Sequence, residues 1–421
     1  MQLVKQLSTY TFVSFLGAGI NFFLMPYLSH FINPAEYGIL SILNTFVSLI
    51  IPLVGLVATS IITVEYYKLK DKREFASLFS SVQLIPIIPA IISLVITVLF
   101  RGPLCRFLEL PESEWHWLPI SVLLAVFTIY YETLLMFNVA EKKPVHYAVF
   151  NIVKLSVEVS LTIWFVSGLG MGWEGRMWSW VISTALLGIV SFFYFNQRGL
   201  LTKKISKNFY WAGIIFGLPL ILHTIGKFVI NQSNRIFIAK LDSVEEAGIY
   251  NVGAQVGMVI LLLVNAIGNF YQPYLYERLT NLTHAAKLQI VKMTYTIMLG
   301  LMAALVALTV LAHPFFKYLV DEKYFKATRY VFWVGLGYFF WGVYILFTGF
   351  VFYQKQTNFL GVLAIINVSV SIALNYWLIS VFGPLGAAYA SALSFLIVAF
   401  MVIWKANRLF PLPWLSFRKA I

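Results

Sequence analysis

Polar and charged side chains recur every four residues in the otherwise apolar stretch LILHTIGKFVINQSNRIFIAK. The stretch covers residues 220–240, and its polar members are His223, Lys227, Asn231 and Arg235, with Asn234 beside them. Side chains four residues apart lie on one face of a helix. Arg and Lys bind oxyanions through charge-assisted hydrogen bonds, and phosphate fits them well. We therefore predict that this face lines a hydrated cationic cavity for an anionic ligand.

Each member of this stripe also has a simpler interpretation. Arg235 lies near a predicted helix end and could serve as an anchor at the membrane interface. Lys227 could form a buried pair with Glu132 or Glu158, and His223 alone is typical of a hydrogen-bonded packing residue. We favour the cavity because all the members share one face.

A second charged set lies on another apolar helix. Lys154 and Glu158 are four residues apart, where opposite charges neutralise each other across one helical turn. We prefer a structural ion pair. The alternative is a proton or cation site, with Glu132 as a further candidate, because an isolated carboxylate in an apolar span has a raised pKa and can take up a proton.

The elements that carry these residues are helices that cross a membrane. The chain has 421 residues, of which 60% are hydrophobic and 11% charged, and its mean hydropathy is +0.83. Apolar runs long enough to span a bilayer recur from end to end, without strand alternation. The first run is too long for a cleavable signal, and we expect it to be the first span. We predict an all-α polytopic membrane protein with twelve helices, near residues 9–30, 38–64, 77–100, 117–138, 146–167, 174–195, 209–238, 247–272, 292–312, 328–352, 358–380 and 386–405.

The net charge of +13 comes mostly from Lys and Arg in the predicted cytoplasmic loops, and it does not indicate binding to nucleic acid. With the N-terminus in the cytoplasm, clearly more Lys and Arg fall in the inner segments than in the outer ones. This bias predicts that both termini are cytoplasmic. The loops are too short for an extramembrane domain, and the single Cys105 excludes an intramolecular disulfide.

Two segments of the chain resemble each other at an offset of 210 residues. Glu36 then matches Glu246, Gly38 matches Gly248, and Asn21 matches Asn231. Six helices return a chain to its starting side, so the halves form a parallel repeat, which we place at residues 1–200 and 201–421. Transporters built from parallel repeats bind their substrate between the halves.

Amide side chains extend the predicted binding face beyond the cationic stripe. The eighth predicted helix carries Asn251, Gln255, Asn265 and Asn269 at close to helical spacing, and Asn21 lies on the first helix. We assign Gln255, Asn265, Asn269 and Asn21 to substrate binding, together with Lys227, Arg235, His223, Asn231 and Asn234.

Three segments resemble a known family. NFFLMPYLSHFINPAEYGILSIL is similar to the opening of Wzx-type polysaccharide flippases, DSVEEAGIYNVGAQVG to its counterpart before the eighth helix, and FGPLGAAYASALS to the start of the twelfth. The chain is thus identified as a member of the multidrug/oligosaccharidyl-lipid/polysaccharide exporter superfamily.

The resemblance implies a MATE-like fold of two six-helix lobes around a V-shaped central cavity. It implies alternating-access transport of an undecaprenyl-diphosphate-linked oligosaccharide across the bacterial inner membrane, with the cations of the seventh helix on the diphosphate. Polysaccharide polymerase machinery is the protein partner that it implies.

Two other classes stay open. A cation-coupled multidrug antiporter of the same superfamily needs cavity carboxylates, whereas the faces found here are basic. A membrane polysaccharide polymerase or ligase generally has a large outer loop, and the outer loops here are short. We find no catalytic constellation, metal cluster or phosphate-binding Gly loop, so we expect neither an enzyme nor a cofactor. Coupling to a proton or Na⁺ gradient stays open.

Overall fold

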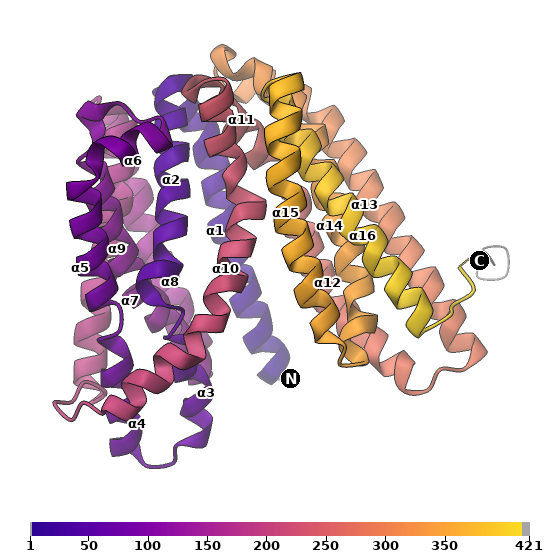
Figure 1. Ribbon diagram of the computed structural model, residues 1–421, viewed down its shortest axis with the longest axis horizontal. Helices are drawn as coiled ribbons and strands as arrows, with labels where there is room; N and C mark the ends of the chain where they lie inside the picture. The colour runs from indigo at the N-terminus through magenta and orange to yellow at the C-terminus, as the bar shows by residue number, and fades with distance from the viewer. Residues whose placement is uncertain (1, 415–421) are drawn as a thin grey trace. The chain divides into compact units, whose positions relative to one another are not determined.

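The computed structural model describes residues 2–414, and within them the side chains of all residues except 2–12, 14, 18, 21, 219, 222, 223, 227, 231 and 357. In this part of the chain every regular element is a helix (Figure 1). Ten of the described helical segments are long and apolar enough to cross a membrane, by length and composition. These features confirm the predicted all-α polytopic membrane protein.

The chain divides by its internal contacts into two compact units, Met1–Phe228 and Val229–Ile421. The division falls inside α10 (Lys207–Leu241). The boundary expected at residue 200 lies in the loop that precedes this helix. We refer to the two parts as unit 1 and unit 2.

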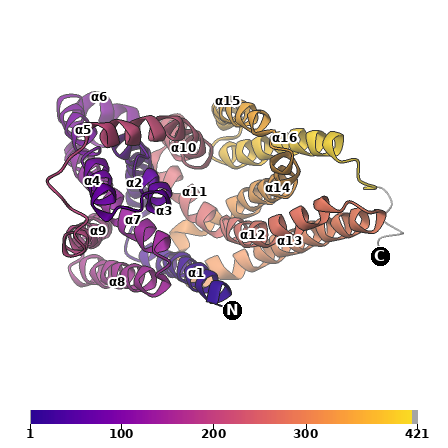
Figure 2. The ribbon, with the colours of Figure 1, turned by 90° about the horizontal axis from the view of Figure 1, so that it is seen from below.

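Unit 1 is built around one central helix. Its α-helices are α1 (Gln2–Ser29), α2 (Pro34–Gly55), α3 (Ser60–Lys68), α4 (Lys72–Gln83), α5 (Ile87–Leu99), α6 (Arg101–Leu108), α7 (Trp117–Ala140), α8 (Pro144–Thr162), α9 (Gly172–Gln197) and the first part of α10. The π-helical segment Ile163–Gly168 extends α8. The central helix is α7, which packs against α2, α5, α8 and α9, whereas α1 packs against α8 (Figures 1 and 2).

Unit 2 repeats this arrangement. Its helices are the rest of α10, then α11 (Val244–Gly257), α12 (Val259–Thr280), α13 (His284–Leu319), α14 (Thr328–Tyr353), α15 (Thr357–Phe382) and α16 (Leu385–Leu409). Here α14 is central, packing against α11, α12, α13 and α16. Helices α7 and α14 are the fourth members of the two predicted halves, so the same position of the repeat supplies the central helix in both units.

Three of the predicted helices are broken, which the sequence analysis did not anticipate. Residues 38–64 divide into α2 and α3, residues 77–100 into α4 and α5, and residues 247–272 into α11 and α12. The first break follows from Leu56 and Val57, whose φ angles of 48° and 50° are left-handed. At the second break Pro86 precedes α5, and proline has no N–H to continue a helical ladder.

The matched sequence segments perform the same structural task in both units. Asn33 and Glu36 form a reciprocal capping box at the start of α2, with N···O distances of 2.9 and 3.0 Å. Ser243 caps α11 by accepting from the backbone N–H of Glu246 at 3.1 Å. In each unit the turn before this capped helix also packs against the start of another helix, which is α9 in unit 1 and α16 in unit 2. Gly172 there faces the Glu36 carboxylate in unit 1, and Gly383 faces Asp242 in unit 2, both with positive φ.

Candidate functional site

A small polar pocket lies inside unit 2 and contains two of the predicted site residues. About 20 Å³ is available to the centres of water molecules, which is room for about one water. We call it the Asn234 pocket. It is lined by residues of α10, α11, α14 and α16, together with the Met258 linker between α11 and α12: Ile230, Asn234, Arg235, Tyr250, Ala254, Met258, Val334, Tyr338, Ser391 and Phe395.

Arg235 brings a fixed positive charge to this pocket. It lies about 9 Å along α10 from the end of that helix and is only 7% exposed. Its Nε donates to Oδ1 of Asn251 on α11 at 2.8 Å. The aromatic side chains of Tyr250 and Tyr338 line the same pocket. A guanidinium ion is costly in an apolar span, and such residues commonly mark a substrate or ion path.

Asn234 connects three helices within unit 2. Its Nδ2 donates to the hydroxyl of Tyr250 at 3.0 Å and to Oγ of Ser391 at 2.8 Å. Its side chain is 3% exposed, and its Oδ1 has no hydrogen-bond partner among the described residues. A buried acceptor of this kind favours a donor in the pocket, such as a water or a ligand hydroxyl.

The other predicted members of the cationic face are placed differently or fall outside the described side chains. The side chains of His223, Lys227, Asn231 and Asn21 lie outside the described residues. Gln255 is half-buried on α11. Asn265 and Asn269 are exposed on α12, beyond the break at Met258. The structure thus brings Arg235, Asn234 and Asn251 together and leaves Asn265 and Asn269 on another helix segment.

The sequence analysis did not identify Tyr250, Tyr338 and Ser391 as pocket residues. Ser391 belongs to the small-residue start of α16, which allows that helix to approach its neighbours closely. The internal repeat does not carry the pocket, since Leu24 and Met25 stand at the positions that match Asn234 and Arg235. The pocket is therefore a feature of one half of the repeat.

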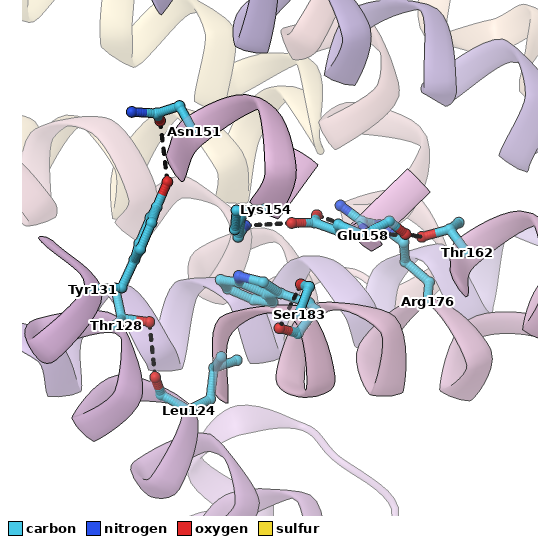
Figure 3. Close-up of polar contacts among 10 residues, drawn as sticks. Leu124, Thr128, Tyr131, Asn151, Lys154, Glu158, Thr162, Arg176 and Ser183 are labelled. Carbon is cyan, nitrogen blue, oxygen red and sulfur yellow. Dashed lines mark hydrogen bonds and ion pairs between the residues drawn. The ribbon is translucent and has the colours of Figure 1, made fainter. Parts of the chain in front are cut away.

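A charged cluster lies in unit 1, on α8 and α9 (Figure 3). Glu158 accepts from Lys154 through Oε2 and from Arg176 Nη1 through Oε1, the latter at 2.7 Å. Arg176 Nη1 also donates to Oγ1 of Thr162 at 3.2 Å. We call Lys154, Glu158 and Arg176 the charge triad. The Glu158 side chain is 5% exposed, whereas those of Lys154 and Arg176 are 18% and 19% exposed.

The charge triad contains a residue, Arg176, that the sequence analysis did not single out. Arg176 is the fifth residue of α9, and its side chain reaches across to α8. The spacing of Lys154 and Glu158 predicts their pairing, but the third member depends on how α8 packs against α9. The remaining candidate, Glu132, is exposed on α7.

A second group of the same composition lies where α7, α8 and α9 meet at their ends. Glu141 pairs with Arg198 at 2.7 Å and with Lys143 at 2.9 Å. We call these three residues the helix-end group. Among the described residues, no group of three His, Cys, Asp or Glu side chains could hold a metal ion.

Comparison with known proteins relates this architecture to a family. Residues 3–279 match the family model described as polysaccharide biosynthesis protein. A protein of Haemophilus influenzae described as an uncharacterized membrane protein is 26% identical over 284 residues, which are 66% of this chain and 66% of the relative. The chain thus matches just under two thirds of that relative's length.

Two solved structures share the fold. The lipid II flippase MurJ, in an inward closed conformation, superposes with a TM-score of 0.73 at 13% identity, over 96% of this chain and 87% of that one. An inward-facing multidrug resistance MATE family transporter of the MOP superfamily has a TM-score of 0.66 at 14% identity, over 96% of both chains. These identities show the fold alone. Together with the family match, they confirm the resemblance and the MATE-like fold predicted from the sequence, and the chain belongs to the polysaccharide biosynthesis protein family of multi-pass membrane proteins.

Proposed function

We propose that this protein is a flippase, which moves an undecaprenyl-diphosphate-linked oligosaccharide across the bacterial inner membrane by alternating access. The observation that carries the proposal is Arg235, a guanidinium ion buried among α10, α11, α14 and α16 in unit 2 of a chain from a polysaccharide biosynthesis family. A guanidinium ion offers a planar fork of donors that matches a phosphate.

The exterior of the helices supports transport of a ligand with both polar and apolar parts. Large apolar side chains are exposed along α5, α13 and α15, as expected for helix faces in contact with lipid. By contrast, the amides of Asn265 and Asn269 are exposed on α12. Amides exposed to hydrocarbon would leave their hydrogen bonds unmade, so we assign this face to water and sugar hydroxyls.

The Asn234 pocket as it stands is too small for a diphosphate, since it has room for about one water. Substrate binding therefore requires the pocket walls, which include Tyr338 and Phe395, to move away from Arg235. This requirement fits a transporter that opens and closes its site in each cycle. We assign Lys227 and Arg235 to the diphosphate, and Glu132 to coupling with a proton or Na⁺ gradient.

Replacing Arg235 with Gln tests this proposal. Gln retains a donor for Asn251 but removes the charge, so we expect flipping of a fluorescent polyprenyl-diphosphate oligosaccharide in proteoliposomes to slow by about 10- to 100-fold. Arg329→Gln is the matched control, because Arg329 pairs with Glu246 at 2.9 Å and is exposed at the start of α14. Equal rates for wild type and Arg235→Gln, with both proteins folded, would remove Arg235 from the substrate site.

A further inference from the structure

The charge triad does not balance its own charge. Both cations of the triad form their ion pairs with the single carboxylate of Glu158, and within the described residues neither pairs with any other acid. Two positive charges on one negative charge leave a net charge of +1 in a membrane-spanning segment. We infer that the charge triad is a binding site for one singly charged oxyanion, the carboxylate of an acidic sugar. This inference rests on the proposed function, because it assigns the site to the transported oligosaccharide.

The triad has hydrogen-bond donors left for such a ligand. Arg176 makes its contacts within the described structure through Nη1, which leaves Nη2 and Nε as donors. Lys154 uses one of its three N–H donors on Glu158. Both cations are partly exposed, whereas Glu158 is buried. Glu158 thus binds both cations from the buried side, and the exposed donors of Lys154 and Arg176 are available to a ligand.

The two helices of the triad contribute their charges at different depths. Glu158 lies about 21 Å along α8 from its first residue, Pro144, and about 15 Å before the end of the π-helical segment at Gly168. The hydrocarbon core of a bilayer is about 30 Å thick. Glu158 therefore lies near the middle of its span, whereas Arg176 lies about 6 Å along α9 from its first residue, Gly172. The triad extends from the middle of α8 toward the end of the span, where both a transported sugar and a lipid phosphate can reach it, and the lipid composition of the vesicles distinguishes the two.

The amount of charge favours a carboxylate over the diphosphate of the lipid carrier. A diphosphate diester carries two negative charges, which would leave the occupied triad with a net negative charge. A sugar carboxylate carries one and brings the net charge to zero. Its two oxygens also match the donor fork of arginine.

A pair of substrates tests the inference. They are polyprenyl-diphosphate disaccharides that differ only at the terminal residue, which is glucuronic acid in one and glucose in the other. We expect the wild type, in phosphatidylcholine vesicles, to flip the acidic substrate about tenfold faster than the neutral one. Arg176→Gln and Lys154→Gln each leave a balanced ion pair with Glu158, so both variants should fold and bring the ratio of the acidic to the neutral flipping rate close to one.

The helix-end group supplies the matched control. Arg198→Gln removes one of two cations from Glu141, as Arg176→Gln does from Glu158, and it should keep the preference for the acidic substrate. Equal wild-type rates for both substrates, equal slowing of both by Arg176→Gln, or loss of the preference in Arg198→Gln would overturn the inference and leave the flippase proposal standing. Flipping of both substrates that increases equally with phosphatidylglycerol in the vesicles, and that loses this dependence in Arg176→Gln, would identify a lipid as the ligand and also overturn it. If the wild type flips neither substrate, the proposed function itself is wrong.

Discussion

Replacing Glu158 with Ala is expected to lower the free energy of unfolding by about 3–5 kcal/mol. Glu158 holds Lys154 and Arg176 in place from a buried position, and its loss leaves two neighbouring cations without a counter-charge in an apolar span. Attraction within a buried ion pair offsets the cost of taking the charges out of water, so removing one partner exposes the full cost. Equilibrium unfolding of the purified protein in mixed detergent micelles measures the change.

Glu141→Ala is the comparison for this variant. It removes the carboxylate from the same set of residue types, but at the helix ends, where water can hydrate Arg198 and Lys143. The expected loss there is about 1 kcal/mol or less. A loss for Glu158→Ala no larger than that for Glu141→Ala would show that the charge triad does not need its carboxylate for stability.

Replacing Gly217 with Ala is expected to reduce stability by at least about 3 kcal/mol. A Cβ atom at this position of α10 would overlap the carbonyl oxygen of Leu56, at the break between α2 and α3. The obstacle is backbone, so no side-chain rotation relieves it. Leu56 and Val57 already have positive φ angles, which leaves this backbone little freedom to adjust. The yield of monodisperse protein and its thermal unfolding midpoint both report the effect.

Gly300→Ala is the control for Gly217→Ala, because no loss of stability is expected at this helical glycine. A Cβ atom there has no neighbour within 4 Å, so the substitution should be neutral or stabilise α13 by up to about 1 kcal/mol. Similar unfolding midpoints for the two variants would mean that α10 does not pack closely on the α2–α3 break.

Hydrophobic run length was enough to place the helices but not their breaks. An apolar run of about 20 residues has to span a bilayer as a helix, and each predicted run coincides with helical structure. A glycine precedes each of two breaks, Gly55 before Leu56 and Gly257 before Met258. Glycines such as Gly300 also lie inside unbroken helices, so a glycine alone does not identify a break. The break at Leu56 and Val57 lies directly against Gly217, which comes from a helix more than a hundred residues later.

The same limit applies to the candidate sites. The helical period is enough to place Arg235 on the polar face of α10, and to place Lys154 beside Glu158 on α8. Spacing within one helix does not predict their partners, because Tyr338, Ser391 and Arg176 come from other helices. The predicted face of the eighth helix assumed a straight helix. The break at Met258 separates Asn251 from Asn265 and Asn269, so spacing across it no longer places them on one face.

The rate at which the wild-type protein flips a polyprenyl-diphosphate oligosaccharide tests the central claim most directly. The label on the sugar would be quenched by a membrane-impermeant reductant, in proteoliposomes and in protein-free vesicles of the same lipids. We predict a flipping rate at least about ten times that of the protein-free vesicles, and a return to the background rate when Arg235 is replaced with Gln. A wild-type rate equal to that of the protein-free vesicles, from protein that remains folded, would contradict the assignment of this chain as a flippase for lipid-linked oligosaccharides.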